Sequence, residues 1–487
     1  MSFITMPEPN RYIIDKKNDI ISALEQILPG NSVISNSSEV LAYECDALVA
    51  YRCSPLAVVL PRTTKEVSAI MKLCHKMGVP IVPRGAGTSL AGGSLPTADS
   101  IILGTSRLNK TLEIDIKNRF IRVQSGVTNL SVSNAVDKEG FFYAPDPSSQ
   151  LACAIAGNIA MNSGGAHCLK YGVTTNNLLG VKIVLADGEI VEIGADYLQS
   201  AGYDLLGIIC GSEGQLGIVT EATLKIIPKP EGARPVLIGF DSPEVAGTCV
   251  ANIIKAGILP VAIEYMDRLS IGATDKFSGA GYPDVEALLI VEVEGSEKEI
   301  DHQLKKIIKI AKKLNPVELR QSNSEHESAL IWKGRKSAFG AIGQIADYIC
   351  LDGTVPVSQL AYVLKRIGEL SKKYDLKVAN VFHAGDGNMH PLILYNANDI
   401  EELEKAEKLG AEILNTCVEV GGCLTGEHGV GIEKRDLMEN QYSKQDLEMQ
   451  MQIKDCFDEK WLLNPAKVFP LELSKSRREL LAKGEIK

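Results

Sequence analysis

The chain lacks several features that would have assigned it to a class at once. Its eleven cysteines include no Cys-x-x-Cys pair, so no ligand set for an iron–sulfur cluster is visible, and a scattered, odd-numbered set fits reduced thiols in the cytoplasm. No apolar run approaches the ~18 residues of a membrane span, and residues 1–15 lack the apolar core of a signal peptide. The net charge of −10 argues against a general nucleic-acid-binding protein. We therefore expect a cytoplasmic protein without a transmembrane segment or nucleic-acid partner. Peripheral association with the inner face of a membrane, or with a partner subunit, stays open.

What is present fits a soluble globular protein of two or three domains. The chain has 487 residues, of which 45% are hydrophobic and 23% charged, an ordinary balance for such proteins. In the first half, residues 56–60 and 79–82 are predicted strands, and Thr63 to Glu66 is a capping box that opens a helix between them. Further strands are expected at 101–103, 120–124, 179–185 and 189–193, the last two forming a hairpin. We expect residues 1–230 to form one α+β domain with its core at about 50–230.

The second half has a different pattern. Residues 227–235 combine charge with proline and are interpreted as a linker. Predicted strands at 236–240 and 287–293 alternate with amphipathic helices such as 297–314, which suggests a second α+β domain with an antiparallel sheet at 231–440. Residues 441–487 are expected to be helical, interrupted at 461–465, and to pack back on the first domain.

A glycine-rich loop follows the second predicted strand. Residues 84–93 contain four glycines and two hydroxyl side chains, a composition that lets successive backbone N–H groups surround an anion such as a pyrophosphate. The loop matches neither the Rossmann fingerprint nor a Walker A loop, because Leu90 stands at the third glycine position and no Gly-Lys-Ser/Thr follows. Alone, it fits a surface turn equally well. Similar segments at 144–149, 157–158, 162–165 and 211–217 favour backbone wrapped around a long ligand.

The order of these segments resembles a known family. The series Pro83 to Leu90, Pro145 to Ser149, Gly157-Asn158, Ser163 to Gly165 and Gly211 to Gly217 is similar to the FAD-binding domain of the vanillyl-alcohol-oxidase superfamily. The second half, above all residues 379–391, resembles the FAD-linked 2-hydroxy-acid dehydrogenase branch of that superfamily. The likeness covers nearly the whole chain. The combination of these segments is specific to the family, although each loop alone is a weak signal. It implies an α+β protein with a two-part FAD-binding domain and an α+β substrate (cap) domain that contains an antiparallel sheet.

The resemblance also implies noncovalent FAD. The first loop would hold the pyrophosphate, residues 145–149 and 157–165 would line the flavin, and 217–219 would contact the adenine half. Some relatives tether the flavin through a histidine, but residues 84–89 contain none, and His167, the histidine nearest the flavin loops, is interpreted as structural. The implied cofactor residues are Pro83, Arg84, Gly85, Ala86, Gly87, Thr88, Ser89, Gly92, Pro145, Asp146, Ser149, Gly157, Asn158, Ser163, Gly164, Gly165, Gly217, Ile218 and Val219.

Two short segments combine histidine with turn-forming glycine, namely 383–390 and 426–429. Residues 378–382 and 389–395 are predicted strands with a turn at 385–388, and residues that flank a hairpin loop face each other with Cβ atoms about 5 Å apart. The hairpin would therefore bring His383 and His390 together, and Glu427 would have to come from a distant turn. Two histidines and a carboxylate suit Zn²⁺, Mn²⁺ or Fe²⁺. Histidines that merely hydrogen-bond at a turn are the alternative, but this grouping among only seven histidines favours a metal.

The resemblance assigns roles to these residues and to one arginine. His383, His390 and Glu427 match the metal ligands of the branch, and His428 matches the base that takes the substrate's hydroxyl proton. Arg335 matches the arginine that binds the substrate carboxylate. Asp386 and Asn388 are expected to make the turn rather than to orient ligands, and Lys333 and Lys336 are expected to be solvated.

Two positions bear on the substrate. Relatives in this branch that act on 2-hydroxyglutarate have a lysine where this chain has Cys350 and an asparagine where it has Leu392. Losing both polar groups argues against a site for a second carboxylate and favours glycolate or D-lactate. We expect FAD- and metal-dependent oxidation of glycolate to glyoxylate, with D-lactate to pyruvate as the alternative. A flavin-containing electron-transfer subunit and a ligand-binding module without flavin are further alternatives. Electrons would pass to a quinone, a soluble carrier or a partner, and the resemblance makes iron–sulfur and second flavin-domain subunits plausible partners.

Overall fold

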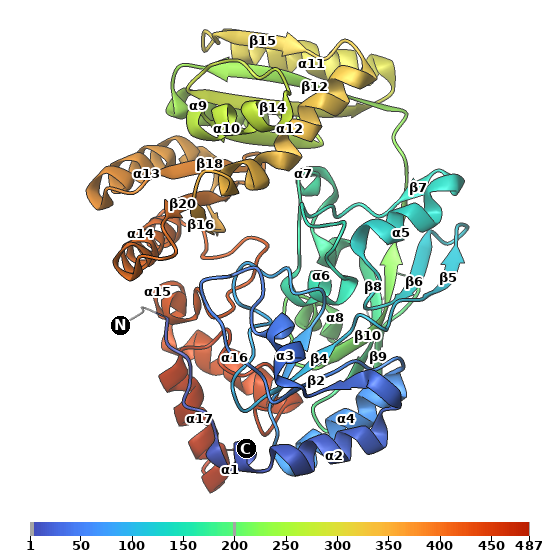
Figure 1. The fold of residues 1–487 in the computed structure, drawn as a ribbon. Helices are drawn as coiled ribbons and strands as arrows, with labels where there is room; N and C mark the ends of the chain where they lie inside the picture. The colour runs from blue at the N-terminus through green and yellow to red at the C-terminus, as the bar shows by residue number, and fades with distance from the viewer. Residues whose placement is uncertain (1–3, 198–200, 487) are drawn as a thin grey trace. The chain divides into compact units, whose positions relative to one another are not determined.

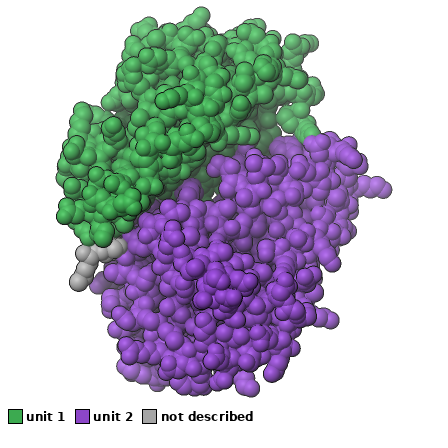
Figure 2. Space-filling model, viewed as in Figure 1, with its two compact units in different colours: residues 1–3, 164–172, 229–427 green, residues 4–163, 173–228, 428–487 purple. Residues whose placement is uncertain are grey.

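The computed structural model describes residues 4–197 and 201–486 and has the α+β architecture implied by the sequence. Figure 1 labels its helices and strands, and Figure 2 shows that they gather in two compact units. One unit, the sheet unit, contains residues 164–172 and 229–427. The other, the loop unit, contains residues 4–163, 173–228 and 428–487. Neither unit is a single continuous stretch of chain. Among the described residues, no helix is both long and apolar enough to cross a bilayer.

The loop unit contains a four-stranded sheet in the order β1-β2-β4-β3, in which β2 and β3 both run parallel to β4. Helix α4 connects β2 to β3 and begins at the predicted capping box, where Thr63 and Glu66 cap each other's backbone N–H groups. Gly78 ends the helix in the left-handed conformation. The elements are β1 (Val33–Ile34), β2 (Ala57–Val59), α4 (Thr64–Met77), β3 (Ile81–Arg84) and β4 (Ile101–Gly104).

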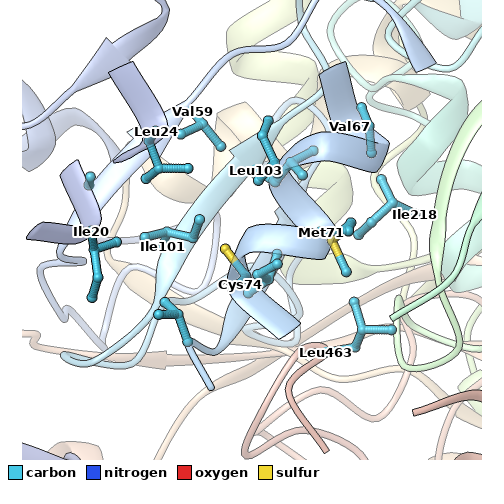
Figure 3. Close-up of a cluster of buried hydrophobic side chains, with 14 of the residues drawn as sticks. Ile20, Leu24, Val59, Val67, Met71, Cys74, Ile101, Leu103, Ile218 and Leu463 are labelled. Atoms are coloured by element: carbon cyan, nitrogen blue, oxygen red, sulfur yellow. The ribbon is translucent and has the colours of Figure 1, made fainter. Parts of the chain in front are cut away.

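The core of this part lies between α4, the sheet and helix α2 (Lys17–Ile27) (Figure 3). Val67, Ile70, Met71 and Cys74 recur at helical spacing and are buried, whereas Met77 is only partly buried. Burying one such side chain contributes about 1.5–3 kcal/mol, so this face fixes α4 against the strand that leads into the first glycine loop.

A second, antiparallel sheet of the loop unit has the order β5-β6-β10-β8-β9, and the predicted hairpin is present as β8 and β9. The prediction that Gly157 and Asn158 lie in a tight loop is wrong, because both fall inside helix α6. The interruption expected at 461–465 is present between α16 and α17. The elements are β5 (Thr111–Asp115), β6 (Phe120–Gln124), α5 (Asn129–Val136), β7 (Phe141–Phe142), α6 (Ile155–Met161), β8 (Leu178–Val184), β9 (Ile190–Gly194), β10 (Ile218–Lys225), β11 (Ile227–Pro228), α16 (Lys444–Phe457) and α17 (Leu471–Lys483), with the short helices α1 (Arg11–Asp15), α3 (Ser37–Val40), α8 (Leu205–Ile209) and α15 (Met438–Gln441).

The sheet unit is built on antiparallel pairs, as predicted, with β12-β14-β13-β18 at the centre. Strand β14 is buried along almost its whole length, so helices cover both of its faces. Its elements are α7 (Cys168–Tyr171), β12 (Gly232–Phe240), α9 (Pro243–Lys255), β13 (Ala262–Asp267), α10 (Arg268–Ser278), β14 (Ala287–Gly295), α11 (Glu297–Lys312), β15 (Glu318–Gln321), α12 (Glu325–Gly343), β16 (Asp347–Cys350), β17 (Gly353–Thr354), α13 (Leu360–Tyr374), β18 (Val378–His383), β19 (Asn388–Met389), β20 (Pro391–Tyr395) and α14 (Ile400–Glu419).

The predicted linker at 227–235 is partly wrong, because its last four residues belong to β12. The strand tolerates Pro235 for a geometric reason. The carbonyl oxygen of Pro235 accepts a hydrogen bond from the N–H of Ser322, so the proline nitrogen faces the same side, just beyond the ladder that β12 forms with β15. The missing N–H therefore costs no bond to β14 on the other side.

Candidate active site

A hairpin positions the two histidines of the first motif. His383 ends β18 and lies opposite Asn388 of β19, so its cross-strand partner is Asn388 and not His390 as predicted. The structure nevertheless brings the two imidazoles together, with ring centroids 5.2 Å apart and planes at 82°.

The turn of this hairpin is held by its own residues. The carboxylate of Asp386 accepts a hydrogen bond of 3.1 Å from the N–H of Asn388, which is the turn role expected of Asp386. Burial raises the pKa of Asp386 to about 6. Gly387 has a φ of +78°, and a side chain there would put its Cβ 2.0 Å from the carbonyl oxygen of Val355. Only glycine therefore fits this position without moving the neighbouring backbone.

Glu427 supplies the third donor of the candidate metal site. Its Oε1 lies 3.4 Å from Nε2 of His383 and 3.3 Å from Nε2 of His390. One ligand atom from each of the three residues falls within a 4.8 Å group. In a tetrahedral site with metal–ligand bonds of about 2.0–2.1 Å, two donors stand about 3.3 Å apart, so the observed spacing fits a divalent ion such as Zn²⁺.

Asp352, which sequence reasoning did not single out, holds the turn that carries Glu427. It is buried, and its carboxylate accepts hydrogen bonds from the N–H groups of Gly426 at 3.0 Å and Glu427 at 3.2 Å. The hydroxyl of Thr425 donates a third. These bonds tie the Glu427 turn to the end of β16, although the two segments are more than 70 residues apart in the chain.

A second buried carboxylate, Glu264 of β13, lies behind the histidines. Its Oε1 is 2.8 Å from Nδ1 of His383, and its Oε2 accepts from Nε of Arg335 at 2.7 Å and from Nη2 at 2.6 Å. Burial by itself raises the pKa of Glu264, but the charges of His383 and Arg335 outweigh it and bring the pKa below its usual value. Burial lowers the pKa of His383, but Glu264 and Glu427 reverse that effect and hold it well above its usual value.

Arg335 occupies the buried face of α12, whereas Lys333 and Lys336 on the same helix are exposed, as predicted. The partner that the structure gives Arg335 is Glu264. Its assignment to a substrate carboxylate stays a prediction.

The candidate cofactor loops of the loop unit approach one another closely. A Cβ placed on Gly85 would be 3.4 Å from the backbone nitrogen of Gly157, so the first glycine loop lies against α6. Nη1 of Arg84 donates to the carbonyl oxygen of Cys45 at 2.7 Å, and the N–H of Gly93 donates to Oγ of Ser89 at 3.0 Å. These two hydrogen bonds fix the conformation of the loop. Consecutive backbone N–H groups in a glycine-rich loop of this kind can bind an anion such as a pyrophosphate.

Asn129, another residue that sequence reasoning missed, joins two of the predicted flavin segments. Its Nδ2 donates to the carbonyl oxygen of Pro145 at 3.0 Å and to Oδ1 of Asn158 at 3.1 Å. Asn129 and Asn158 are both buried. The side chain of Asn129 thus holds residues 145 and 158 together.

The 211–217 loop is tied to the segment that follows His428. The carboxylate of Glu213 accepts from the N–H groups of Val430 at 2.6 Å and Gly431 at 2.8 Å, and all three residues are buried. The side-chain amide of Asn464 donates to the carbonyl oxygens of Glu213 and Gly93. These bonds connect the first glycine loop, the 211–217 loop and the segment after His428 within one unit.

Not all predicted site residues fall in the same unit. Pro83 to Gly92, Pro145 to Ser163 and Gly217 to Val219 belong to the loop unit, as does His428, whereas Gly164 and Gly165 belong to the sheet unit. His167 lies in the sheet unit with its Nε2 3.3 Å from Glu292 and its ring 5.5 Å from that of Trp332. These contacts agree with the structural interpretation of His167. The metal-ligand candidates all lie in the sheet unit.

One signal could have found the missed carboxylates. Glu264 is the only charged residue in the apolar run 261–266, and Asp352 ends the apolar run 348–352. A charge that is buried in a strand requires a partner, so such isolated carboxylates indicate an ion pair or a network.

Comparison with known proteins defines the class. Residues 55–194 match the model of the FAD binding domain, and residues 229–468 match the model of FAD linked oxidases, C-terminal domain. The chain is 48% identical over 456 residues to glycolate oxidase subunit GlcD of Escherichia coli (strain K12), covering 93% of this chain and 91% of that one. The chain therefore belongs to the FAD-linked oxidases, and it is an FAD-linked oxidoreductase.

Two further relatives are similar over almost their whole length. The Bacillus subtilis (strain 168) glycolate oxidase subunit GlcD is 38% identical, with 92% of this chain and 96% of that one covered. The D-lactate dehydrogenase of Archaeoglobus fulgidus is 33% identical, with 87% and 94% covered. The motifs of the sequence are likewise most similar to those of the flavin subunit of bacterial glycolate oxidase, and these identities confirm that similarity.

Solved structures agree on the fold. The 4-ethylphenol oxidase of Gulosibacter chungangensis superposes with a TM-score of 0.81 at 17% identity, covering 96% of this chain and all of that one. p-Cresol methylhydroxylase superposes with a TM-score of 0.79 at 16% identity, covering 96% and 99%. At such identities the match concerns the fold alone, and it confirms the vanillyl-alcohol-oxidase-type architecture.

Proposed function

We propose that this chain oxidises a small 2-hydroxy acid to the 2-oxo acid, with glycolate to glyoxylate as the first choice, and that it needs FAD and a divalent ion of zinc, manganese or iron. The observation that carries the proposal is the cluster of His383, His390 and Glu427, with one donor atom each inside 4.8 Å. The 48% identity over 93% of the chain to glycolate oxidase subunit GlcD supports the choice of acid.

The oxidation removes a proton from the hydroxyl group and a hydride from the α-carbon. A divalent ion on His383, His390 and Glu427 would lower the pKa of a hydroxyl bound to it. FAD, when bound, supplies the hydride acceptor at its N5 atom. His428 is assigned the hydroxyl proton, since imidazole accepts protons near neutral pH. Arg335 is assigned the substrate carboxylate, which a guanidinium can hold with two parallel hydrogen bonds.

We propose that the glycine-containing segments of the first half bind the cofactor. We assign the pyrophosphate to Pro83–Ser89 and Gly92, the flavin to 145–149 and 157–165, and the adenine half to 217–219. We assign the cofactor to domain 1–230, the substrate to domain 231–440, and a supporting role to 441–487. The close approach of Gly85 to Gly157 and the bridge made by Asn129 support one continuous cofactor site.

D-Lactate is the second candidate substrate. Relatives at 30–33% identity are named D-lactate dehydrogenases, and the two acids differ by one methyl group. A methyl-sized difference is worth only about 1–3 kcal/mol of discrimination in an apolar pocket.

The relative at 48% identity is named a subunit, which supports partner chains for this protein too. We propose that iron–sulfur and second flavin-domain subunits, a quinone or a soluble carrier take the electrons. We propose a cytoplasmic location, with peripheral contact to the inner face of the membrane.

One experiment tests substrate, cofactor and metal together. Purified protein should show a flavin absorption band at about 450 nm, and glycolate added under anaerobic conditions should bleach it. Chelation should abolish bleaching without removing the flavin, and one of the three metals should restore it. His428→Ala should prevent bleaching, whereas His302→Ala, an exposed histidine on α11, should not. A flavoprotein that neither acid bleaches would contradict the substrate assignment and favour an electron-transfer subunit. A colourless protein would contradict the cofactor assignment.

A further inference from the structure

We infer that Glu264 is a positioning residue that sets two parts of the site at once, the metal ligand His383 and the guanidinium of Arg335. Its two carboxylate oxygens are divided between them, Oε1 at 2.8 Å from His383 and Oε2 within 2.7 Å of two Arg335 nitrogens. Metal affinity and affinity for the substrate carboxylate would then depend on one buried side chain. The inference rests on the function proposed above.

The contact with His383 selects the tautomer that can bind a metal. A neutral imidazole carries its proton on one nitrogen and a lone pair on the other. An oxygen of Glu264 lies 2.8 Å from Nδ1, where it can accept a hydrogen bond from the Nδ1–H of a neutral His383; the lone pair of that tautomer is on Nε2, the atom that lies 3.4 Å from Glu427. The carboxylate thus directs the metal-binding nitrogen toward the other ligands and raises its basicity.

The contact with Arg335 fixes which edge of the guanidinium is offered. A guanidinium has a side edge, made by Nε and Nη2, and an end edge, made by Nη1 and Nη2. Both donors of the side edge converge on Oε2 of Glu264. The end edge is therefore the one directed away from Glu264, and it can still form two parallel bonds with a carboxylate.

The position of Glu264 in the sheet makes the arrangement rigid. It lies on β13, directly opposite His383 on β18, and its side chain is completely buried. The same strand offers a matched control in Asp267, three residues further along. Asp267 is partly buried, and it also ties β13 to β18, by accepting from the N–H of Asn380 at 2.7 Å and from Nδ2 at 2.9 Å. It touches neither His383 nor Arg335 in the contacts that the described residues make.

Glu264→Gln separates positioning from mere stability. A glutamine has one acceptor oxygen and one N–H₂ group, so it must present a donor to either His383 or Arg335, both of which are donors here. We expect the affinity of chelator-treated protein for Zn²⁺ or Mn²⁺, measured by calorimetry, to fall about 10–100-fold. We expect the KM for glycolate to rise as well, and ¹⁵N spectra of labelled histidine to lose the Nδ1–H signature of one residue. Asp267→Asn should lower the melting temperature and leave metal affinity and KM close to wild type.

The outcomes distinguish the two proposals. If wild-type protein binds no divalent ion or oxidises neither acid, the proposed function fails. If wild type does both and Glu264→Gln keeps the same metal affinity and KM, only the role of Glu264 is overturned. Equal losses in Glu264→Gln and Asp267→Asn would also overturn it, since they would show a general structural effect. Should Glu264→Gln not fold, Glu264→Asp makes the same test, because it keeps the charge but withdraws the carboxylate by one methylene. For Glu264→Asp we expect the same fall in metal affinity and the same rise in the KM for glycolate.

Discussion

Cys350 and Leu392 lie directly opposite each other on strands β16 and β20, and both are buried. The sequence resemblance implies lysine and asparagine at these two positions in relatives that act on 2-hydroxyglutarate. Because the two residues are cross-strand neighbours, a change at one alters the space available to the other. We propose that together they form one apolar wall of the substrate pocket, which would favour a small acid without a second carboxylate.

Removing bulk from this wall should leave more space for the substrate and shift the preference from glycolate toward D-lactate. Cys350→Ala removes the sulfur, so we expect the ratio of kcat/KM for D-lactate to that for glycolate to rise, within the about 10–200-fold that one methyl group can supply. Steady-state kinetics with a dye acceptor measure it. Cys249→Ala, a buried cysteine on α9, is the control and should leave the ratio unchanged. An unchanged ratio in Cys350→Ala would remove Cys350 from the substrate pocket.

Local signals were enough to predict several elements from the sequence. The capping box at Thr63 predicts the start of α4, because both of its side chains lie within four residues of the chain. The turn between His383 and Asn388 could be predicted for the same reason, since all its determinants lie within six residues. Gly157 shows the limit, because its glycine and asparagine composition indicated a loop although the chain there is helical.

The supporting residues of the site could not be located in this way. Glu264 and His383 are 119 residues apart, and they meet only because β13 pairs with β18. Asp352 and Glu427 are likewise 75 residues apart. The register between distant strands depends on the packing of the whole sheet, so no local sequence pattern predicts it. An isolated carboxylate in an apolar strand indicates that a partner exists, but not which one.

The hairpin that carries both histidines should depend on Gly387. Gly387→Ala combines a strained φ of +78° with a Cβ 2.0 Å from the carbonyl oxygen of Val355. We expect it to lower the melting temperature and to reduce metal content after purification, measured by elemental analysis. Gly281→Ala is the control, since it has a φ of +71° but no atom within 4 Å of its Cβ. It should cost only about 1–2 kcal/mol of stability and keep the metal. Full metal content in Gly387→Ala would contradict this role.

Glu213 should affect turnover through the segment that follows His428. Its carboxylate binds two consecutive N–H groups at 430 and 431, and Glu213→Gln leaves one acceptor oxygen for both. Hydrogen bonds to a charged group are worth about 1.5–3 kcal/mol, so we expect the segment to loosen and kcat for glycolate to fall while KM and flavin content stay near wild type.

A matched buried carboxylate in the same unit provides the control for Glu213. Asp458 also accepts from two consecutive N–H groups, those of Leu462 and Leu463. Asp458 also pairs with the buried ammonium of Lys454 at 2.6 Å, so Asp458→Asn should lower stability by at least as much as Glu213→Gln, without a selective loss of kcat. If both variants lose kcat in proportion to their loss of stability, Glu213 has no special connection with the base.

Lys467 should give the protein a pH-dependent stability that a single variant removes. The side chain is completely buried and donates to the carbonyl oxygens of Leu95 at 2.5 Å and Pro465 at 3.0 Å. Burial lowers the pKa of Lys467 to about 7, against about 10.4 for a lysine in the unfolded chain. Between these values the unfolded chain binds more protons, so the contribution of Lys467 to the free energy of unfolding rises with pH. It is complete above about pH 10.4 and lost as the pH falls to about 7.

Urea unfolding of wild type and Lys467→Met at pH 7, 8 and 9 isolates this contribution, because all other titrating groups are shared. We expect the difference in free energy of unfolding to shift in favour of wild type as the pH rises, by up to about 1.4 kcal/mol per pH unit. The variant should therefore be least harmful at pH 7, where wild type must bury a charged ammonium. A difference that stays constant across this range would show that Lys467 is charged in the folded protein throughout, and that the carbonyl oxygens of Leu95 and Pro465 are sufficient to keep it so.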